Sequence, residues 1–297
     1  MLRILWVGAA ALTVIVLLTP SGRHRASVWL AAARGGEGAP SLREAVAQTA
    51  PWSLQDRVRR LLGPKAEPVH RALETPPPDP DGGPLDKELI TLQTTWCCDQ
   101  LNIHYSLLKA GKTPHEIHQH DDEELLIPIS GEVAIVRPTG ESPAGPGRLI
   151  YHASLSPHTI RAEGSGDASY LVLRWRGSEG AAGAPLEAQV ADFRPQLEAG
   201  LASAGGGVSH SASLLDGETR FLSRAYVHLR SLEPGGEIAE HEDDHDALMV
   251  VLRGVVETQG RRLEAPAASF NPAFARHGFR NPGPGVAQYL AIDLTPR

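Results

Sequence analysis

The 297-residue sequence predicts an all-β protein built from two tandem antiparallel β-barrels, preceded by a short helical N-terminal region. Three observations favour this fold class. From about Leu89 onward, strand-length apolar runs are separated by Gly, Pro, Asp and Ser. The chain contains 30 glycines and 24 prolines, which favours short strands joined by turns over long helices. Finally, the strand-rich part of the chain repeats itself.

The repeat is kept in both sequence and spacing. His104–Gly111 (HYSLLKAG) resembles His228–Gly235 (HLRSLEPG). The matched landmarks of the two copies are His118 and His241, Gly131 and Gly254, His158 and His277, and Tyr170 and Tyr289. In each copy thirteen residues separate the first histidine from the glycine, and twelve separate the second histidine from the tyrosine. Chance rarely preserves such intervals together, so the sequence predicts a duplicated β domain.

The N-terminal segment differs from the rest of the chain. Ile4–Leu18 is an uncharged apolar run that follows Arg3. Its length suits the core of a signal peptide or a short transmembrane helix. Arg23 and Arg25 behind the run outnumber Arg3 in front of it, so the positive-inside rule favours a membrane anchor with cytoplasmic barrels. An exported protein, or a soluble cytoplasmic one with a later start codon, is the alternative.

Proline and glycine divide the remaining chain into domains. Ser41–Glu44 (SLRE) has the pattern of a helix capping box. Thr75–Pro84 (TPPPDPDGGP) cannot continue a helix or a sheet, and it is therefore expected to be a linker. Gly177–Pro185 is a second interruption of this kind. The predicted boundaries are 1–22 for the hydrophobic segment, 23–88 for helices and linker, 89–178 for the first barrel, 179–215 for a second linker, and 216–297 for the second barrel.

Charge and cysteine content exclude some functions. The formal net charge of −7 leaves no basic surface for a nucleic-acid partner. Cys97 and Cys98 are adjacent, and we expect them in a buried strand rather than in a redox site.

A dense group of histidines and acids, HEIHQHDDEELLIPISG, begins at His115. If a strand starts here, His118 and His120 share a face, and Glu124 lies close enough to reach the same pocket. Imidazoles with a carboxylate suit Fe(II), Mn(II), Ni(II), Cu(II) or Zn(II). A fourth ligand must come from elsewhere in the chain, and His158 is the natural candidate. The alternative is a solvated turn rich in acids and histidines.

The spacing of His118, His120, Glu124 and Gly131 resembles the first conserved motif of the cupin superfamily. Gly147–Ile160 resembles the second motif, in which His158 is the histidine, although His152 stands where a proline is usual. The resemblance implies barrels of the jelly-roll (double-stranded β-helix) type. It also implies one divalent metal ion, with Fe(II) favoured, held by the two histidines, the glutamate and His158.

The second copy also resembles a cupin, but its ligand set is depleted. His241 and His277 keep the first and last ligand positions. Asp243 replaces the second histidine, and an alanine replaces the glutamate. Asp244 or His245 could substitute as ligands. We therefore expect a mainly structural barrel, with a possible second metal site at His241 and His277.

What the resemblance implies is a metal-dependent enzyme acting on a small organic substrate, with a dioxygenase favoured. Three histidines and one glutamate leave coordination positions open for substrate or O₂. Glu124 would serve as a ligand or as a catalytic base. The alternatives are a redox-neutral isomerase, decarboxylase or lyase, and a non-catalytic protein that binds or senses a small molecule. Homo-oligomers and membrane attachment through residues 4–18 are further expectations.

We also make predictions for three further positions. His104 and His228 recur at matched positions and face either the barrel interior or the outer surface. Glu123 is expected to point away from the metal site, so Glu123→Gln should change little.

Overall fold

The computed structural model describes residues 64–177, 185–199 and 208–297. Within these residues the chain forms β-strands and one short helix, α5 (Arg194–Ala199). The predicted all-β fold class is confirmed, and the strand pairings given below are antiparallel. The helix expected at Ser41–Glu44 lies outside the described residues.

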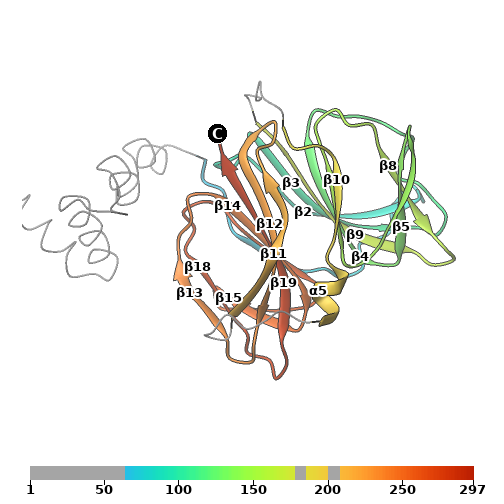
Figure 1. The fold of residues 1–297 in the computed structure, drawn as a ribbon. Coiled ribbons are helices and arrows are strands. Elements are labelled where there is room, and N and C mark those ends of the chain that lie inside the picture. The colour runs from blue at the N-terminus through green and yellow to red at the C-terminus, as the bar shows by residue number, and fades with distance from the viewer. Residues whose placement is uncertain (1–63, 178–184, 200–207) are drawn as a thin grey trace, which may run out of the picture. The chain divides into compact units, whose positions relative to one another are not determined.

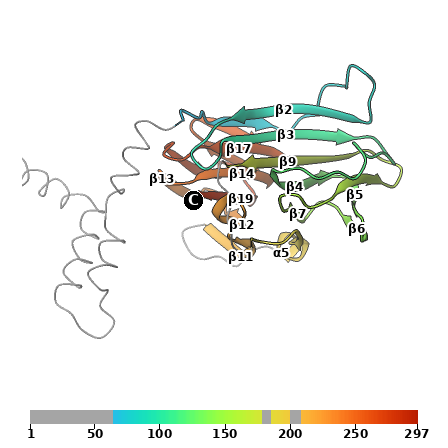
Figure 2. The same cartoon turned by 90° about the horizontal axis from the view of Figure 1, so that it is seen from above.

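The first barrel contains two sheets. The strands of its six-stranded sheet are, in spatial order, β10 (Gln189–Asp192), β7 (Arg148–His152), β4 (Glu123–Ser130), β9 (Ala168–Arg176), β3 (Gln100–Leu108) and β2 (Leu85–Gln93). Its smaller sheet consists of β6 (Gly140–Ala144), β5 (Glu132–Arg137) and β8 (Thr159–Glu163). Figure 2 shows β2, β3, β9, β4 and β7 side by side in this order.

The second barrel repeats this plan, and Figure 1 shows its orange and red strands beside the green strands of the first. Its six-stranded sheet contains β1 (Val69–Ala72), β17 (Ala267–Asn271), β14 (Asp246–Arg253), β19 (Ala287–Pro296), β12 (Leu222–Leu232) and β11 (Val208–Gly217). Its smaller sheet contains β13 (Glu237–His241), β18 (His277–Arg280), β15 (Val255–Thr258) and β16 (Arg261–Glu264).

The large sheets are buried on both faces, and alternate side chains therefore enter different apolar regions. On β4, Leu125 and Ile127 face a core shared by both barrels, whereas Leu126 faces the interior of the first barrel. On β14, Leu248 faces the shared core and Met249 faces the interior of the second barrel. Successive side chains of a strand point to opposite faces, so every second residue of these strands is available to a site inside the barrel.

Segments expected to be linkers contribute strands at the sheet edges. β1 lies within residues 23–88, yet it pairs with β17 of the second barrel. β10 and α5 lie within residues 179–215, and β10 pairs with β7 of the first barrel. β2 begins at Leu85, a few residues before the predicted start of the first barrel. Thr75–Pro84 contains none of these strands, in keeping with its proline content.

Glu123, the first residue of β4, is a fully buried carboxylate that joins the two barrels. It accepts hydrogen bonds from the Tyr151 hydroxyl (2.8 Å), the Trp175 indole (2.8 Å), the Thr219 hydroxyl (2.6 Å) and the backbone N–H groups of Arg220 (2.8 Å) and Phe221 (3.4 Å). The last three residues form the turn between β11 and β12 of the second barrel. Glu123 points away from the predicted metal site, as expected. Its five hydrogen bonds give it a role in joining the barrels that the sequence did not indicate.

Asp246, the first residue of β14, stands at the matched position of the second barrel and is also fully buried. It accepts hydrogen bonds from the backbone N–H groups of Ala273 (2.8 Å) and Cys97 (3.4 Å). Cys97 lies in the turn between β2 and β3 of the first barrel, where it forms a disulfide with Cys98 rather than lying in a strand. We refer to Glu123 and Asp246 as the inter-barrel carboxylates.

The structure corrects the prediction of a transmembrane anchor. In the part of the chain that it describes, no helix has the length and apolarity needed to cross a bilayer. Ile4–Leu18, on which the anchor and the cytoplasmic orientation rested, lies outside the described residues.

Candidate metal centre

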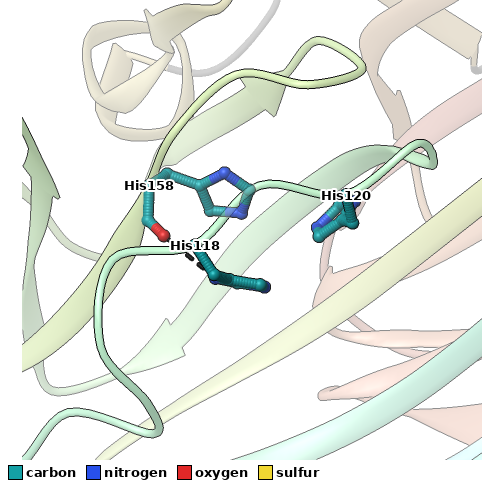
Figure 3. Close-up of side chains that lie close together, drawn as sticks. All are labelled: His118, His120 and His158. Carbon is teal, nitrogen blue, oxygen red and sulfur yellow. Dashed lines mark hydrogen bonds between the residues drawn. The ribbon is translucent and has the colours of Figure 1, made fainter.

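The backbone of the first barrel brings the four predicted ligands together. His118 and His158 form an isolated antiparallel bridge, in which each backbone N–H donates to the carbonyl of the other residue, at 3.2 and 2.9 Å. His120 follows in the loop before β4, so neither of the two motif histidines lies in a strand as expected. Glu124 is the second residue of β4 and faces the barrel interior. Figure 3 shows the three imidazoles around one space.

Each imidazole is held by a backbone carbonyl. Nδ1 of His118 lies 3.1 Å from the His158 carbonyl, Nδ1 of His120 lies 2.9 Å from the Asp122 carbonyl, and Nδ1 of His158 lies 2.7 Å from the Ser156 carbonyl. A carbonyl only accepts, so the proton of each neutral ring sits on Nδ1, and Nε2 keeps its lone pair. This arrangement orients a metal-binding histidine and selects its tautomer.

The Glu124 carboxylate completes the group. Its Oε2 lies 3.7 Å from Nε2 of His120, and its Oε1 lies 3.8 Å from Nε2 of His158. These separations are too long for hydrogen bonds but fall below the roughly 4.2 Å between ligands on opposite sides of an ion at about 2.1 Å. Burial opposes ionisation of Glu124, yet its polar and cationic neighbours, including Arg174 with Nε 3.8 Å from Oε2, outweigh burial and lower the pKa of this carboxyl.

The donor set fits a divalent metal ion. Ligand atoms of His118, His120 and His158 all lie within 4.8 Å of one another, as do those of Glu124, His152 and His158. Nε2 of His120 and of His158 is buried without a hydrogen-bond partner. Buried polar atoms are nearly always satisfied, and a bound ion would satisfy both at once. Three nitrogens and one carboxylate match the mixed set expected for Fe(II), Mn(II) or a related ion.

His152 is a feature of the centre that the sequence indicated only as a departure from the motif. It is fully buried on β7, directly across from Glu124 on β4. Its ring stacks on that of His158, with centroids 3.8 Å apart and planes at 9°. Burial lowers the pKa of His152 to about 3, so the ring is neutral. Both of its nitrogens lack a hydrogen-bond partner, and the ring supports His158 through packing alone.

The centre opens into a cavity of about 190 Å³. Apolar side chains line one part of it: Leu85, Leu126, Ile160 and Val172. Lys87 and Arg174 bring positive charge to the same cavity, and Nε of Arg174 is buried without a hydrogen-bond partner. His104 faces this interior rather than the outer surface. Sequence inspection missed Lys87, because its place beside the centre depends on the pairing of β2 with β3.

The second barrel contains a related group. His241 and His277 pair across β13 and β18 as His118 and His158 do in the first barrel. Asp243, which occupies the position of the second motif histidine, also reaches the group, and ligand atoms of these three residues lie within 4.8 Å of one another. The two histidines were predicted from the sequence, whereas the change to aspartate was expected to deplete the ligand set.

Solved structures with the same arrangement of strands include oxalate decarboxylases. That of Bacillus subtilis, in a study of its Mn(II) centres, is 18% identical, over 82% of this chain and 83% of that chain, with a TM-score of 0.51. That of Lactobacillus farciminis, in complex with formate, is 13% identical, over 78% and 88%, with a TM-score of 0.52. A putative glyoxylate-induced protein from Pseudomonas aeruginosa is 16% identical, over 82% and 87%, with a TM-score of 0.54.

The chain shares with these structures the fold of two tandem antiparallel β-barrels. At these identities the likeness concerns the fold and not the activity. No family model and no curated protein sequence matches the chain. Evidence for the function therefore has to come from the residues inside the two barrels.

Proposed function

We propose that the protein is a metal-dependent enzyme that acts on a small organic substrate in the first barrel. One observation carries this proposal. Three imidazoles with carbonyl-bound Nδ1 atoms lie together beside a cavity, and Nε2 atoms of two of them, His120 and His158, lie 3.7 and 3.8 Å from the Glu124 carboxylate. A structural metal site would not need a cavity next to its ligands.

When bound, a divalent ion would supply Lewis acidity and open coordination positions. The protein residues around it would bind and orient the substrate. Lys87 and Arg174 favour a carboxylate or another anion, because they bring positive charge to a cavity with one lining carboxylate. Nη2 of Arg174 pairs with Asp122 at 2.6 Å, while its Nε has no hydrogen-bond partner. Glu124 is the only carboxylate among the residues that line this cavity, and its lowered pKa keeps it ionised, as a metal ligand requires.

Dioxygenation remains our first choice of reaction, because the mixed nitrogen and oxygen donor set suits Fe(II) with open positions for substrate and O₂. Redox-neutral decarboxylation is the second candidate. It is favoured by the two cationic side chains, which suit an organic acid, and by the oxalate decarboxylases among the similar structures.

The test is an assay of purified, metal-loaded protein against a panel of small mono-, di- and 2-oxo-carboxylic acids. O₂ consumption and CO₂ release are recorded together. O₂ uptake with product formation supports a dioxygenase, and CO₂ release without net O₂ uptake supports the second candidate.

The variant pair for this assay is His118→Ala with His120→Ala, and its matched control is Glu116→Gln in the same loop, where Glu116 is exposed. Turnover lost in the double variant and kept in the control supports the proposal. Turnover that survives loss of both histidines contradicts it. A metal-loaded protein that binds an acid without consuming O₂ or releasing CO₂ also contradicts it, and favours a binding protein.

A further inference from the structure

We infer that the second barrel holds a divalent metal ion of its own, bound by His241, Asp243 and His277. This site has a different donor set from the centre in the first barrel. It is independent of the proposed function, so either one can fail while the other stands.

Backbone carbonyls bind Nδ1 of the two histidines, as they do in the first barrel. Nδ1 of His241 lies 2.9 Å from the Ala239 carbonyl, and Nδ1 of His277 lies 2.9 Å from the Ala275 carbonyl. Both rings therefore carry their proton on Nδ1 in the neutral form and turn Nε2 toward the barrel interior. The two residues are direct Cα partners across β13 and β18, which fixes their spacing.

Asp243 lies between the two imidazoles. Its Oδ2 is 3.3 Å from Nε2 of His241 and 3.3 Å from Nε2 of His277. Two ligands at about 2.1 Å from a tetrahedral ion are about 3.4 Å apart, so these separations already match those of neighbouring ligands. The aspartate at this position therefore offers an oxygen in place of a nitrogen, and this oxygen still lies close to the two imidazoles.

The site opens into a cavity of about 210 Å³. Asp243 and Asp293 line this cavity together with two basic side chains, Arg230 and His245. Asp293 lies on β19 as the Cα partner of Ala247, the residue that replaces Glu124. The carboxylate lost from β14 thus has a counterpart on the strand beside it. Asp293 is paired with His245, whose Nε2 lies 3.6 Å away, so we do not count it among the ligands.

Two imidazoles and one carboxylate, with positions left open, suit Fe(II) or Mn(II). The first barrel offers three imidazoles, and its site should favour later metals such as Ni(II) or Cu(II) more strongly than the second site does. The competing account of the second cluster is a set of aspartate–histidine ion pairs without any metal.

The experiment measures Mn(II) stoichiometry of the full chain by elemental analysis and by the loss of free Mn(II) signal in electron paramagnetic resonance. Four proteins are compared: wild type, His118→Ala with His120→Ala, His241→Ala with His277→Ala, and the combination of all four changes. We expect about two, one, one and no bound ions per chain, respectively. Asp243→Asn, which keeps the side-chain volume, should lose the second ion as the histidine pair does.

His70→Ala is the matched control. His70 lies on β1 of the second barrel, outside the cavity, where its Nδ1 is 2.9 Å from the Ser269 hydroxyl. This variant should keep both ions. A stoichiometry that His241→Ala with His277→Ala and Asp243→Asn leave unchanged would overturn the inference. If the only bound ion is lost with these variants and kept in the first-barrel variant, the inference stands and the proposed function fails.

Discussion

The two barrels have the same strand plan and the same backbone pairing of two histidines, but they differ in the side chains beside them. In the first barrel Glu124 on β4 faces Arg174 on β9 as its Cα partner. In the second barrel the same two places are taken by Ala247 and Asp293. In the first barrel the carboxylate of this pair thus lies on β4, whereas in the second barrel it lies on β19, the counterpart of β9.

In both barrels the backbone pairing of two histidines brings their imidazoles together, although the side chains beside them differ. These different side chains also change the charged groups inside the cavities. Lys87 and Arg174 accompany one carboxylate, Glu124, in the first cavity, whereas the second contains two carboxylates, Asp243 and Asp293, with Arg230 and His245. We propose an anionic organic substrate for the first cavity and a metal ion for the second.

The largest effect should come from breaking the ligand set of the first barrel. His158→Ala is expected to lose both metal and turnover, since it removes an imidazole at the centre of the group. Glu124→Gln leaves three imidazoles, which are enough to hold a divalent ion. It should keep much of its metal yet lose about 100-fold or more in turnover, because a possible base is removed. Metal stoichiometry and initial rates of both variants decide this, and full activity of Glu124→Gln would contradict it.

The inter-barrel carboxylates provide a second comparison, in stability. Glu123→Gln places an amide N–H₂ among donors and should cost about 2–4 kcal/mol in the free energy of unfolding. Asp246→Asn should cost less, about 1–2 kcal/mol. Burial raises the pKa of Asp246, so a neutral side chain is better tolerated there. Urea unfolding of the two variants measures both losses in the free energy of unfolding. A larger loss for Asp246→Asn than for Glu123→Gln would contradict this prediction.

Asp243→His would make the second site more like the first. An imidazole in place of a carboxylate should shift the preference of the site from Mn(II) toward Zn(II) or Ni(II) by roughly tenfold. Competition between these ions, in a background that lacks the first site, is the measurement. The exposed neighbour change Asp244→His is the control and should leave the preference unaltered. An unchanged preference in Asp243→His would mean that this side chain does not contact the ion.

The smallest effect is expected at His152, for which the second barrel has Pro272 near the matched position. His152→Phe keeps an aromatic ring stacked on His158 and removes two buried nitrogens that lack partners. Metal content should stay the same, and the melting temperature should stay the same or rise by a few degrees. Loss of metal in this variant would instead make His152 a ligand.

Much of this arrangement could be predicted from the sequence because it depends on spacing. The intervals around His118 and His158 recur around His241 and His277, and they predicted two barrels with a group of histidines in each. The period of two along β4 predicted that Glu124 and Glu123 face opposite sides. The structure places both side chains in this way.

The remaining features depend on contacts between distant parts of the chain. Glu123 meets Thr219 across 96 residues, and β1 adds to a sheet whose other strands follow the entire first barrel. No local pattern identifies such partners. Asp243 was missed for another reason: it was judged as a missing histidine, although an aspartate in the same place still brings an oxygen to the site.

The hydrogen bonds of Glu123 also affect when the contacts between the two barrels can form during translation. Its partners Thr219, Arg220 and Phe221 leave the ribosome after the whole first barrel has been made. At translation speeds of about 5–20 residues per second, the 96 residues between Glu123 and Thr219 correspond to a delay of roughly 5–20 seconds. During that interval Glu123 has Tyr151 and Trp175 available but lacks its three hydrogen-bond donors from the second barrel. The partners of Asp246 at Cys97 have, in contrast, already been synthesised when Asp246 emerges, so the second barrel can complete its link to the first at once.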